Sequence, residues 1–120
     1  MSAGGAERLV ADRLAAERTS TQARIEDLTR ELDDIAAGSE FTTDDDEHDP
    51  EGATIGYERA LVQGLLAGAR RDLGALNAAE QRLRAGTYGS CVRCGRVIDP
   101  ARLEALPAAA TCIRCADARR

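Results

Sequence analysis

Two pairs of cysteines are the residues in this sequence whose type and spacing best fit a defined chemistry. Each pair has the form C-x-x-C, and seventeen residues separate Cys94 from Cys112. Thiolates are good ligands for Zn²⁺, and a two-residue gap lets both sulfurs of a tight turn face one ion. The spacing predicts that Cys91, Cys94, Cys112 and Cys115 hold one structural zinc ion in a closed tetrahedral site.

Two other uses of paired cysteines fit this sequence less well. Disulfides are typical of secreted domains, but the N-terminal stretch MSAGGAERLV lacks the basic-then-apolar layout of a signal peptide. A redox-active C-x-x-C is expected near alternating strands and helices, and the sequence shows no such pattern.

Because the N-terminal stretch lacks the layout of a signal peptide, we expect a cytoplasmic protein, and no apolar run is long enough to span a membrane. A closed zinc site without a Ser/His/Asp or Cys/His constellation does not predict an enzyme.

The residues around the cysteines predict a small zinc finger over residues 87–120. Gly95 suits the turn after the second ligand, and Asp99-Pro100 has the form of a helix N-cap followed by proline at the first helical position. The single helical turn that follows, ARLEAL, is expected to end before Pro107. Arginines also stand beside the ligands, and they either contact a negatively charged partner or keep the finger soluble: Arg93, Arg96 and Arg114.

Residues 1–86 are expected to form the element that carries this finger. Apolar residues recur at alternating steps of three and four over residues 6–37 and again over 50–85, which is typical of coiled-coil seams. The aromatic content of 2% excludes a large globular core. Gly38 is a plausible end for the first helix, and Asp49-Pro50 a plausible start for the second. The fold class predicted is therefore mainly α: a long antiparallel coiled-coil hairpin, about 50 Å per arm, followed by the four-cysteine finger.

The seam positions are as follows. In the first helix they are Ile25, Leu28, Leu32 and Ile35, with a weaker continuation backward through Thr21, Arg18, Leu14 and Ala11. In the second helix they are Ile55, Arg59, Val62, Leu66, Ala69, Leu73, Leu76, Glu80 and Leu83. The charged members, Arg59 and Glu80, are expected to set the register of the two helices.

The connection between the predicted helices, residues 39–49, is strongly acidic. Residues 40–51 carry seven acids and no base in a chain of net charge −5, so the rest of the chain is net +2. Because a hairpin places this connection at the end far from the finger, we interpret it as a functional tip. The carboxylates proposed to act there are Asp44, Asp45, Asp46, Glu47, Asp49 and Glu51. Asp49 is equally well explained as the N-cap of the second helix.

The C-terminal third, YGSCVRCGRVIDPARLEALPAAATCIRC, closely resembles the zinc finger of the DksA/TraR family of bacterial transcription regulators. The resemblance includes Tyr88-Gly89, Ile98, Arg102-Leu103, Ala105 and Pro107 besides the four cysteines. A hairpin before the finger is also the family's layout, and the stretch DEHDPEGAT is similar to actinobacterial members. In the family's tip pattern, D-x-x-D-x-A, Asp49 matches the first Asp, whereas Gly52 and Thr54 stand at the two other positions.

The resemblance implies a partner and a mechanism. Members of the family bind RNA polymerase, insert the coiled coil into its secondary channel, bring acidic tip residues near the catalytic centre, and often act together with the alarmone ppGpp. We expect this chain to be a monomer. Two rival interpretations remain: a zinc-ribbon nucleic-acid binder and a coiled-coil adaptor with an acidic tip. Strong direct DNA binding is not expected, because the chain is acidic overall and has no aromatic stacking platform.

Overall fold

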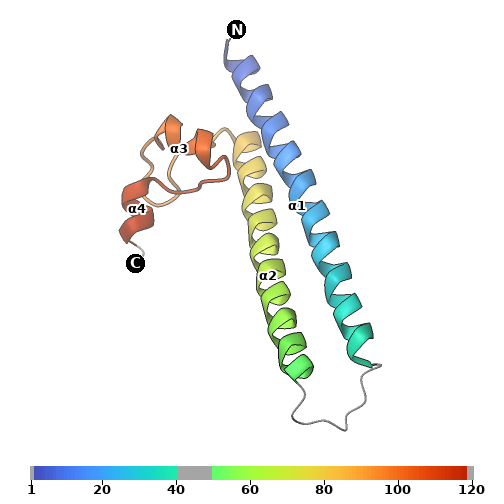
Figure 1. Ribbon diagram of the computed structural model, residues 1–120. Coiled ribbons are helices and arrows are strands. Elements are labelled where there is room, and N and C mark those ends of the chain that lie inside the picture. Colours follow the sequence, from blue (N-terminus) through green and yellow to red (C-terminus); the bar gives the residue numbers. More distant parts are fainter. Residues whose placement is uncertain (1, 41–49, 119–120) are drawn as a thin grey trace. The chain divides into compact units, whose positions relative to one another are not determined.

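The computed structural model describes residues 2–40 and 50–118, and in this part of the chain all regular structure is helical (Figure 1). The two long helices are α1 (Ser2–Glu40) and α2 (Pro50–Ala85), and the two short ones are α3 (Pro100–Ala105) and α4 (Ile113–Ala118). A single antiparallel bridge joins Ser90 and Val97. Among the described residues, no helix is both long and apolar enough to cross a membrane.

The long helices extend beyond some of the limits expected from sequence. Helix α1 begins before residue 6 and continues through Gly38 to Glu40, so that glycine does not end it. An isolated glycine costs a helix only about 1 kcal/mol, which the neighbouring turns can tolerate. Helix α2 begins at Pro50, in agreement with the preference of proline for the first helical turn. Residues 41–49, which include most of the predicted acidic tip, lie outside the described residues.

The chain divides into two compact units, and both contain part of each long helix. One unit comprises Met1–Ser20 and Asp72–Arg120, and the other is Thr21–Arg71. In the first, the start of α1 meets the end of α2. In the second, the end of α1 meets the start of α2, which is the order that an antiparallel hairpin requires. The predicted hairpin is therefore confirmed.

The unit of residues 21–71 has a seam of aliphatic side chains between α1 and α2. Leu28 packs with Val62, Leu66 and Ala69, which are all buried. Three partly buried side chains of α1 pack against this cluster: Ile25, Leu32 and Ile35. These are the positions that the sequence periodicity selects, because residues three and four apart lie on the same face of a helix.

The unit that contains the finger has a second hydrophobic cluster. Leu14 is fully buried against Leu76 and Ala79, and four partly buried residues complete the cluster: Val10, Leu83, Tyr88 and Ala108. Tyr88 and Ala108 belong to the finger, so one core is shared by the long helices and the finger. Leu14 was predicted only as part of a weak seam, and the burial of Ala79 was not predicted.

Two polar seam positions form an ion pair in this same unit. The guanidinium of Arg18 lies 3.3 Å from the carboxylate of Glu80. The Glu80 side chain is 15% exposed and that of Arg18 is 41% exposed, so the pair lies at the edge of the core and is partly hydrated. The expectation that Glu80 sets the register of the helices is consistent with this contact, whereas Arg59 is exposed.

Replacing Leu14 by alanine tests the importance of the shared core. The L14A variant removes a fully buried side chain, so we expect it to lower the free energy of unfolding by about 2–5 kcal/mol. Urea unfolding followed by circular dichroism measures this loss. The matched control is Leu61→Ala, which shortens a leucine that is 53% exposed and should change stability by less than about 0.5 kcal/mol. Equal effects of the two variants would contradict the assignment of the core.

Candidate metal centre

The first C-x-x-C pair lies in a small hairpin that follows α2. The amide of Ile98 donates to the carbonyl of Gly89 at 2.8 Å, and that of Cys91 donates to the carbonyl of Arg96 at 2.8 Å. At the end of this hairpin the amide of Gly95 donates to the carbonyl of Cys91 at 2.9 Å, and Gly95 has a φ of +76°. Since side chains disfavour this conformation, the glycine allows the turn that brings both cysteines to one side.

The second pair lies where α4 begins. The amide of Ala116 donates to the carbonyl of Cys112 at 3.0 Å, which places Cys112 directly before the helix and Cys115 in its first turn. The segment between the pairs contains α3, whose N-cap is Asp99: its carboxylate accepts a hydrogen bond from the amide of Ala101 at 3.0 Å. The predicted cap, with Pro100 at the start of the helix, is confirmed.

The four predicted ligand residues come together. The sulfurs of Cys91, Cys94, Cys112 and Cys115 all lie within 4.8 Å of one another, and none forms a disulfide. The sulfurs of Cys94 and Cys112 are 3.8 Å apart. With Zn–S bonds of about 2.3 Å, a regular tetrahedron has S···S edges of about 3.8 Å. The arrangement therefore fits one structural zinc ion.

The proton affinities of the thiols reflect this crowding. Backbone amides of Cys94 and Cys112 directed at the Cys91 sulfur lower the pKa of Cys91 to about 6. By contrast, the pKa of Cys115 is raised to about 12. The largest cause is hydrogen bonding with the Cys112 side chain, and the second largest is burial. Four negative sulfurs at such short distances repel one another unless a cation lies between them. A divalent metal ion between the sulfurs offsets this repulsion and favours the fully deprotonated form.

Side-chain hydrogen bonds to carbonyls hold the segment between the two cysteine pairs. The Tyr88 hydroxyl donates to the carbonyl of Pro107 at 2.8 Å, and the Arg102 guanidinium donates to that of Thr111 at 3.0 Å. Arg82 of α2 donates to the carbonyl of Ala108 at 3.4 Å. Partial burial raises the pKa of Tyr88. The positive charges of Arg13 and Arg82 act in the other direction and lower this pKa, but their effect is smaller. From the sequence, Tyr88 and Arg102 were recognised only as parts of a motif, and their hydrogen bonds were not predicted.

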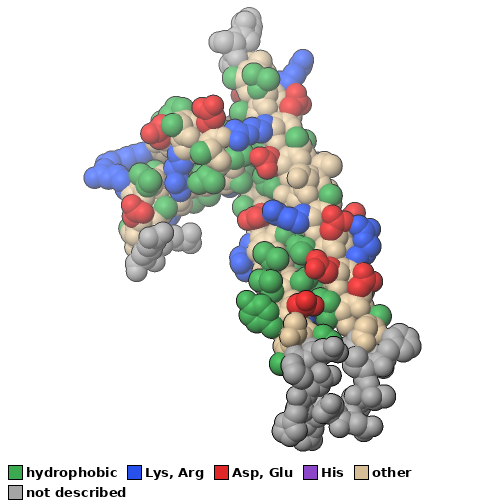
Figure 2. Space-filling view, in the orientation of Figure 1, with side chains coloured by type: hydrophobic (Ala, Val, Ile, Leu, Met, Phe, Trp, Pro, Cys, Tyr) green, Lys and Arg blue, Asp and Glu red, His purple; other side chains and the backbone are tan. Residues whose placement is uncertain are grey.

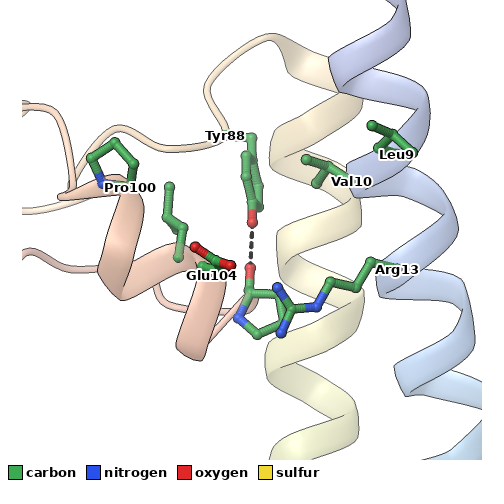
Figure 3. A pocket seen from close by; sticks show the side chains of 8 residues that line it. Leu9, Val10, Arg13, Tyr88, Pro100 and Glu104 are labelled. Carbon is green, nitrogen blue, oxygen red and sulfur yellow. Dashed lines mark hydrogen bonds between the residues drawn. The ribbon is translucent and has the colours of Figure 1, made fainter.

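A groove with a volume of about 320 Å³ lies beside Tyr88, within the same unit. Figure 3 shows side chains of α1 on one side of it and side chains of α3 on the other. Its lining is mostly apolar, with one basic and one acidic residue: Leu9, Val10, Arg13, Tyr88, Pro100, Leu103, Glu104 and Pro107. The groove was not predicted, because it is formed by segments almost 100 residues apart in the chain.

The comparison with known families agrees with this geometry. Residues 86–120 match the family described as the prokaryotic dksA/traR C4-type zinc finger. The structure of the transcription factor DksA2 from Pseudomonas aeruginosa is similar over 94% of this chain and 81% of the other, with 29% identity and a TM-score of 0.76. The chain belongs to the DksA/TraR family. Its family and fold are those of a DksA-type transcription regulator.

Two further comparisons complete this result. The DnaK suppressor protein from Agrobacterium tumefaciens C58, known from a solution structure, is 31% identical in sequence to this chain. The alignment covers 87% of this chain and 91% of that protein's chain, with a TM-score of 0.45. No curated protein matches the sequence significantly. The DksA/TraR match covers all four cysteines, and the zinc assignment stands on both the family and the sulfur geometry.

Most of the acidic residues predicted to act at the tip lie outside the part of the chain that the structure describes. Asp44, Asp45, Asp46, Glu47 and Asp49 lie outside the described residues. Glu51 belongs to the first turn of α2 by its backbone. Their role remains a prediction.

Zinc content and zinc-dependent stability test the metal centre. We expect one zinc ion per chain by elemental analysis, and a lower melting temperature after chelation because metal binding is coupled to folding of the finger. Cys112→Ser removes a ligand and should reproduce the chelated state. Added zinc serves as the control: it should restore the melting temperature of the chelated wild type and not that of the variant. Unchanged melting after complete metal removal would contradict a structural role.

Replacing Tyr88 by phenylalanine tests the hydrogen bond to Pro107. The variant keeps the ring but leaves a carbonyl without its donor, so we expect the free energy of unfolding to fall by about 0.5–1.5 kcal/mol. Tyr57→Phe is the control, since Tyr57 is 72% exposed and should show almost no change. Both are measured by chemical denaturation of the zinc-loaded protein. Equal stabilities of the two variants would show that the Tyr88 bond contributes nothing.

Proposed function

We propose that this protein binds bacterial RNA polymerase and modulates transcription initiation by inserting the segment between α1 and α2 into the secondary channel. One observation carries the proposal: a DksA/TraR zinc finger and a pair of long helices occur in one chain whose fold matches the transcription factor DksA2 with a TM-score of 0.76. The proposed role is regulation by binding, and it requires no catalysis by this chain.

The dimensions of the helical hairpin suit such an insertion. Helices α1 and α2 have 39 and 36 residues, and two packed helices measure about 20 Å across. In each compact unit the two helices share their own hydrophobic cluster. A hairpin packed in this way can enter a narrow opening with its aliphatic seam already buried, although Tyr57, Leu61 and Leu65 of α2 remain exposed.

The charge of the connecting segment supports an action at the polymerase catalytic centre. Residues 40–51 carry seven acids and no base. Carboxylates are hard oxygen ligands that can contact the water shell of Mg²⁺ or repel incoming phosphates, and they can also pair with a basic element of the enzyme. In the proposed mechanism this segment changes the stability of promoter complexes. Cooperation with ppGpp is part of the proposal and rests on the family alone.

Association with core RNA polymerase is the first test of this function. The labelled zinc-loaded protein should bind the core enzyme of its source organism with a dissociation constant in the micromolar range or below. Promoter DNA without polymerase should bind much more weakly, with the steep salt dependence typical of phosphate contacts. In vitro transcription with and without ppGpp then shows the direction of the effect. Tight DNA binding without polymerase association would instead favour the zinc-ribbon nucleic-acid binder.

Neutralising the acidic segment tests the role of its carboxylates. Amide replacement at Asp44, Asp45, Asp46, Glu47, Asp49 and Glu51 should abolish the effect on transcription and change polymerase affinity less than about threefold. The matched control neutralises six exposed acids of α1: Glu7, Asp12, Glu26, Glu31, Asp33 and Asp34. It should retain the transcriptional effect. Parallel loss of affinity and effect in the first variant would show that the segment serves binding only.

A further inference from the structure

The groove beside Tyr88 presents a mostly apolar surface with one charged residue on each wall. Its volume of about 320 Å³ lies at the lower end of the range typical of small-molecule sites. On the α1 wall Leu9 is 72% exposed, and on the α3 wall Leu103 is only partly buried. A small molecule of suitable shape would remove this apolar surface from water, which is favourable.

The groove has few polar groups that a ligand could contact. Pro100 and Pro107 have no backbone N–H to donate, and the Tyr88 hydroxyl donates its proton to the carbonyl of Pro107. The remaining polar side chains of the lining are Arg13 on α1 and Glu104 on α3. Neither forms a hydrogen bond or ion pair with another described residue. A ligand in the groove would therefore make its polar contacts mainly with this one cation and this one anion.

The two charges reach the groove from different helices. Figure 3 shows Arg13 extending from α1 toward α3, and Glu104 projecting from α3 near the hydrogen bond of Tyr88. Burial raises the pKa of Tyr88, whereas the charge of Arg13 lowers it, so the guanidinium acts at close range on the phenol. Figure 2 shows side chains of both charges, with hydrophobic side chains among them, where the finger lies beside the long helices. A ligand would therefore meet a positive and a negative group at once.

This balance of charges selects the class of ligand. A polyphosphate needs several basic groups, whereas the groove has one guanidinium and a carboxylate that repels further negative charge. A purely anionic amphiphile would also place its charge near Glu104, and a neutral apolar molecule would desolvate both charged groups without giving them partners.

A zwitterion with an apolar side chain meets all of these conditions. Its carboxylate can accept two parallel hydrogen bonds from the guanidinium of Arg13, and its ammonium group can donate to the carboxylate of Glu104. Its side chain can cover Leu9 and Leu103, which are both aliphatic.

We propose that this groove binds a free α-amino acid with an apolar side chain. The bound amino acid joins α1 to α3 through its two charged groups. Because Tyr88 also belongs to the cluster around Leu14, the ligand binds the folded form of this unit and stabilises it. The site belongs to the protein alone, and its occupancy does not depend on the proposed binding of RNA polymerase.

A series of related small molecules tests the ligand class. We expect L-leucine and L-phenylalanine to bind the zinc-loaded, isotope-labelled full chain with dissociation constants of about 1 mM or below, and to shift amide resonances of α3 and of the start of α1. Leucine amide lacks the carboxylate, isocaproate lacks the ammonium group, and glycine lacks the apolar side chain. Each of these three should bind at least about fivefold more weakly than leucine, because each leaves one contact unmade.

Matched variants test the two polar contacts. Arg13→Gln and Glu104→Gln each remove one charge from the groove, and each should weaken leucine binding at least about fivefold. Both side chains are exposed, so the melting temperature and zinc content without ligand should equal those of the wild type. The controls are Arg8→Gln and Glu7→Gln, which remove exposed charges of the same unit that do not line the groove. They should change the affinity for leucine less than about twofold.

Four outcomes would overturn the proposal. The first is no saturable binding of either amino acid up to about 20 mM, well above the expected dissociation constants. The second is resonance shifts confined to residues 21–71, which would place the site elsewhere. The third is wild-type affinity for leucine in both groove variants. The fourth is equal affinity for leucine and isocaproate, because the ammonium group and its contact with Glu104 would then contribute nothing.

Discussion

Four sulfurs held within 4.8 Å of one another are the constraint on which the C-terminal unit depends. Full ionisation of such a cluster is unfavourable unless a cation lies between the sulfurs, and the backbone around it has to form two tight turns at once. The glycine at position 95 and the start of α4 provide these turns. Because the turns converge on one point, the residues between and beside the cysteines must face outward around it. The same cluster therefore determines both the local fold and which residues lie on the surrounding surface.

The metal centre is supported by contacts that do not involve sulfur. Hydrogen bonds from Tyr88, Arg102 and Arg82 end on carbonyls of the segment between the cysteine pairs, and Tyr88 and Ala108 join the cluster around Leu14. A finger of about 35 residues buries too little apolar surface to be stable by itself, so metal ligation and packing on the long helices supplement each other. An irregular segment lacks the regular backbone hydrogen bonds of a helix or sheet, and here side-chain donors satisfy the carbonyls of Pro107, Ala108 and Thr111.

Sequence alone was sufficient for the features that depend on local spacing. The zinc ligands, the cap at Asp99, the start of α2 at Pro50 and the seam around Leu28 all follow from intervals of two to four residues, which the geometry of turns and helices fixes. Features that depend on contacts between distant segments were missed or weakly indicated. Ala79 is buried in a cluster that includes Leu14 of the other long helix, and the groove at Tyr88 is lined by residues of both α1 and α3. The prediction that Gly38 ends the first helix was wrong, because a helix can continue through one glycine.

The ion pair between Arg18 and Glu80 has a consequence for how the long helices find their alignment. In an antiparallel hairpin, sliding one helix by a heptad would place Glu80 near Ala11 or Ile25, both uncharged. A largely buried carboxylate without a partner costs far more than a partly hydrated ion pair contributes. The pair therefore disfavours a one-heptad shift, which the repeating aliphatic seam could tolerate by itself.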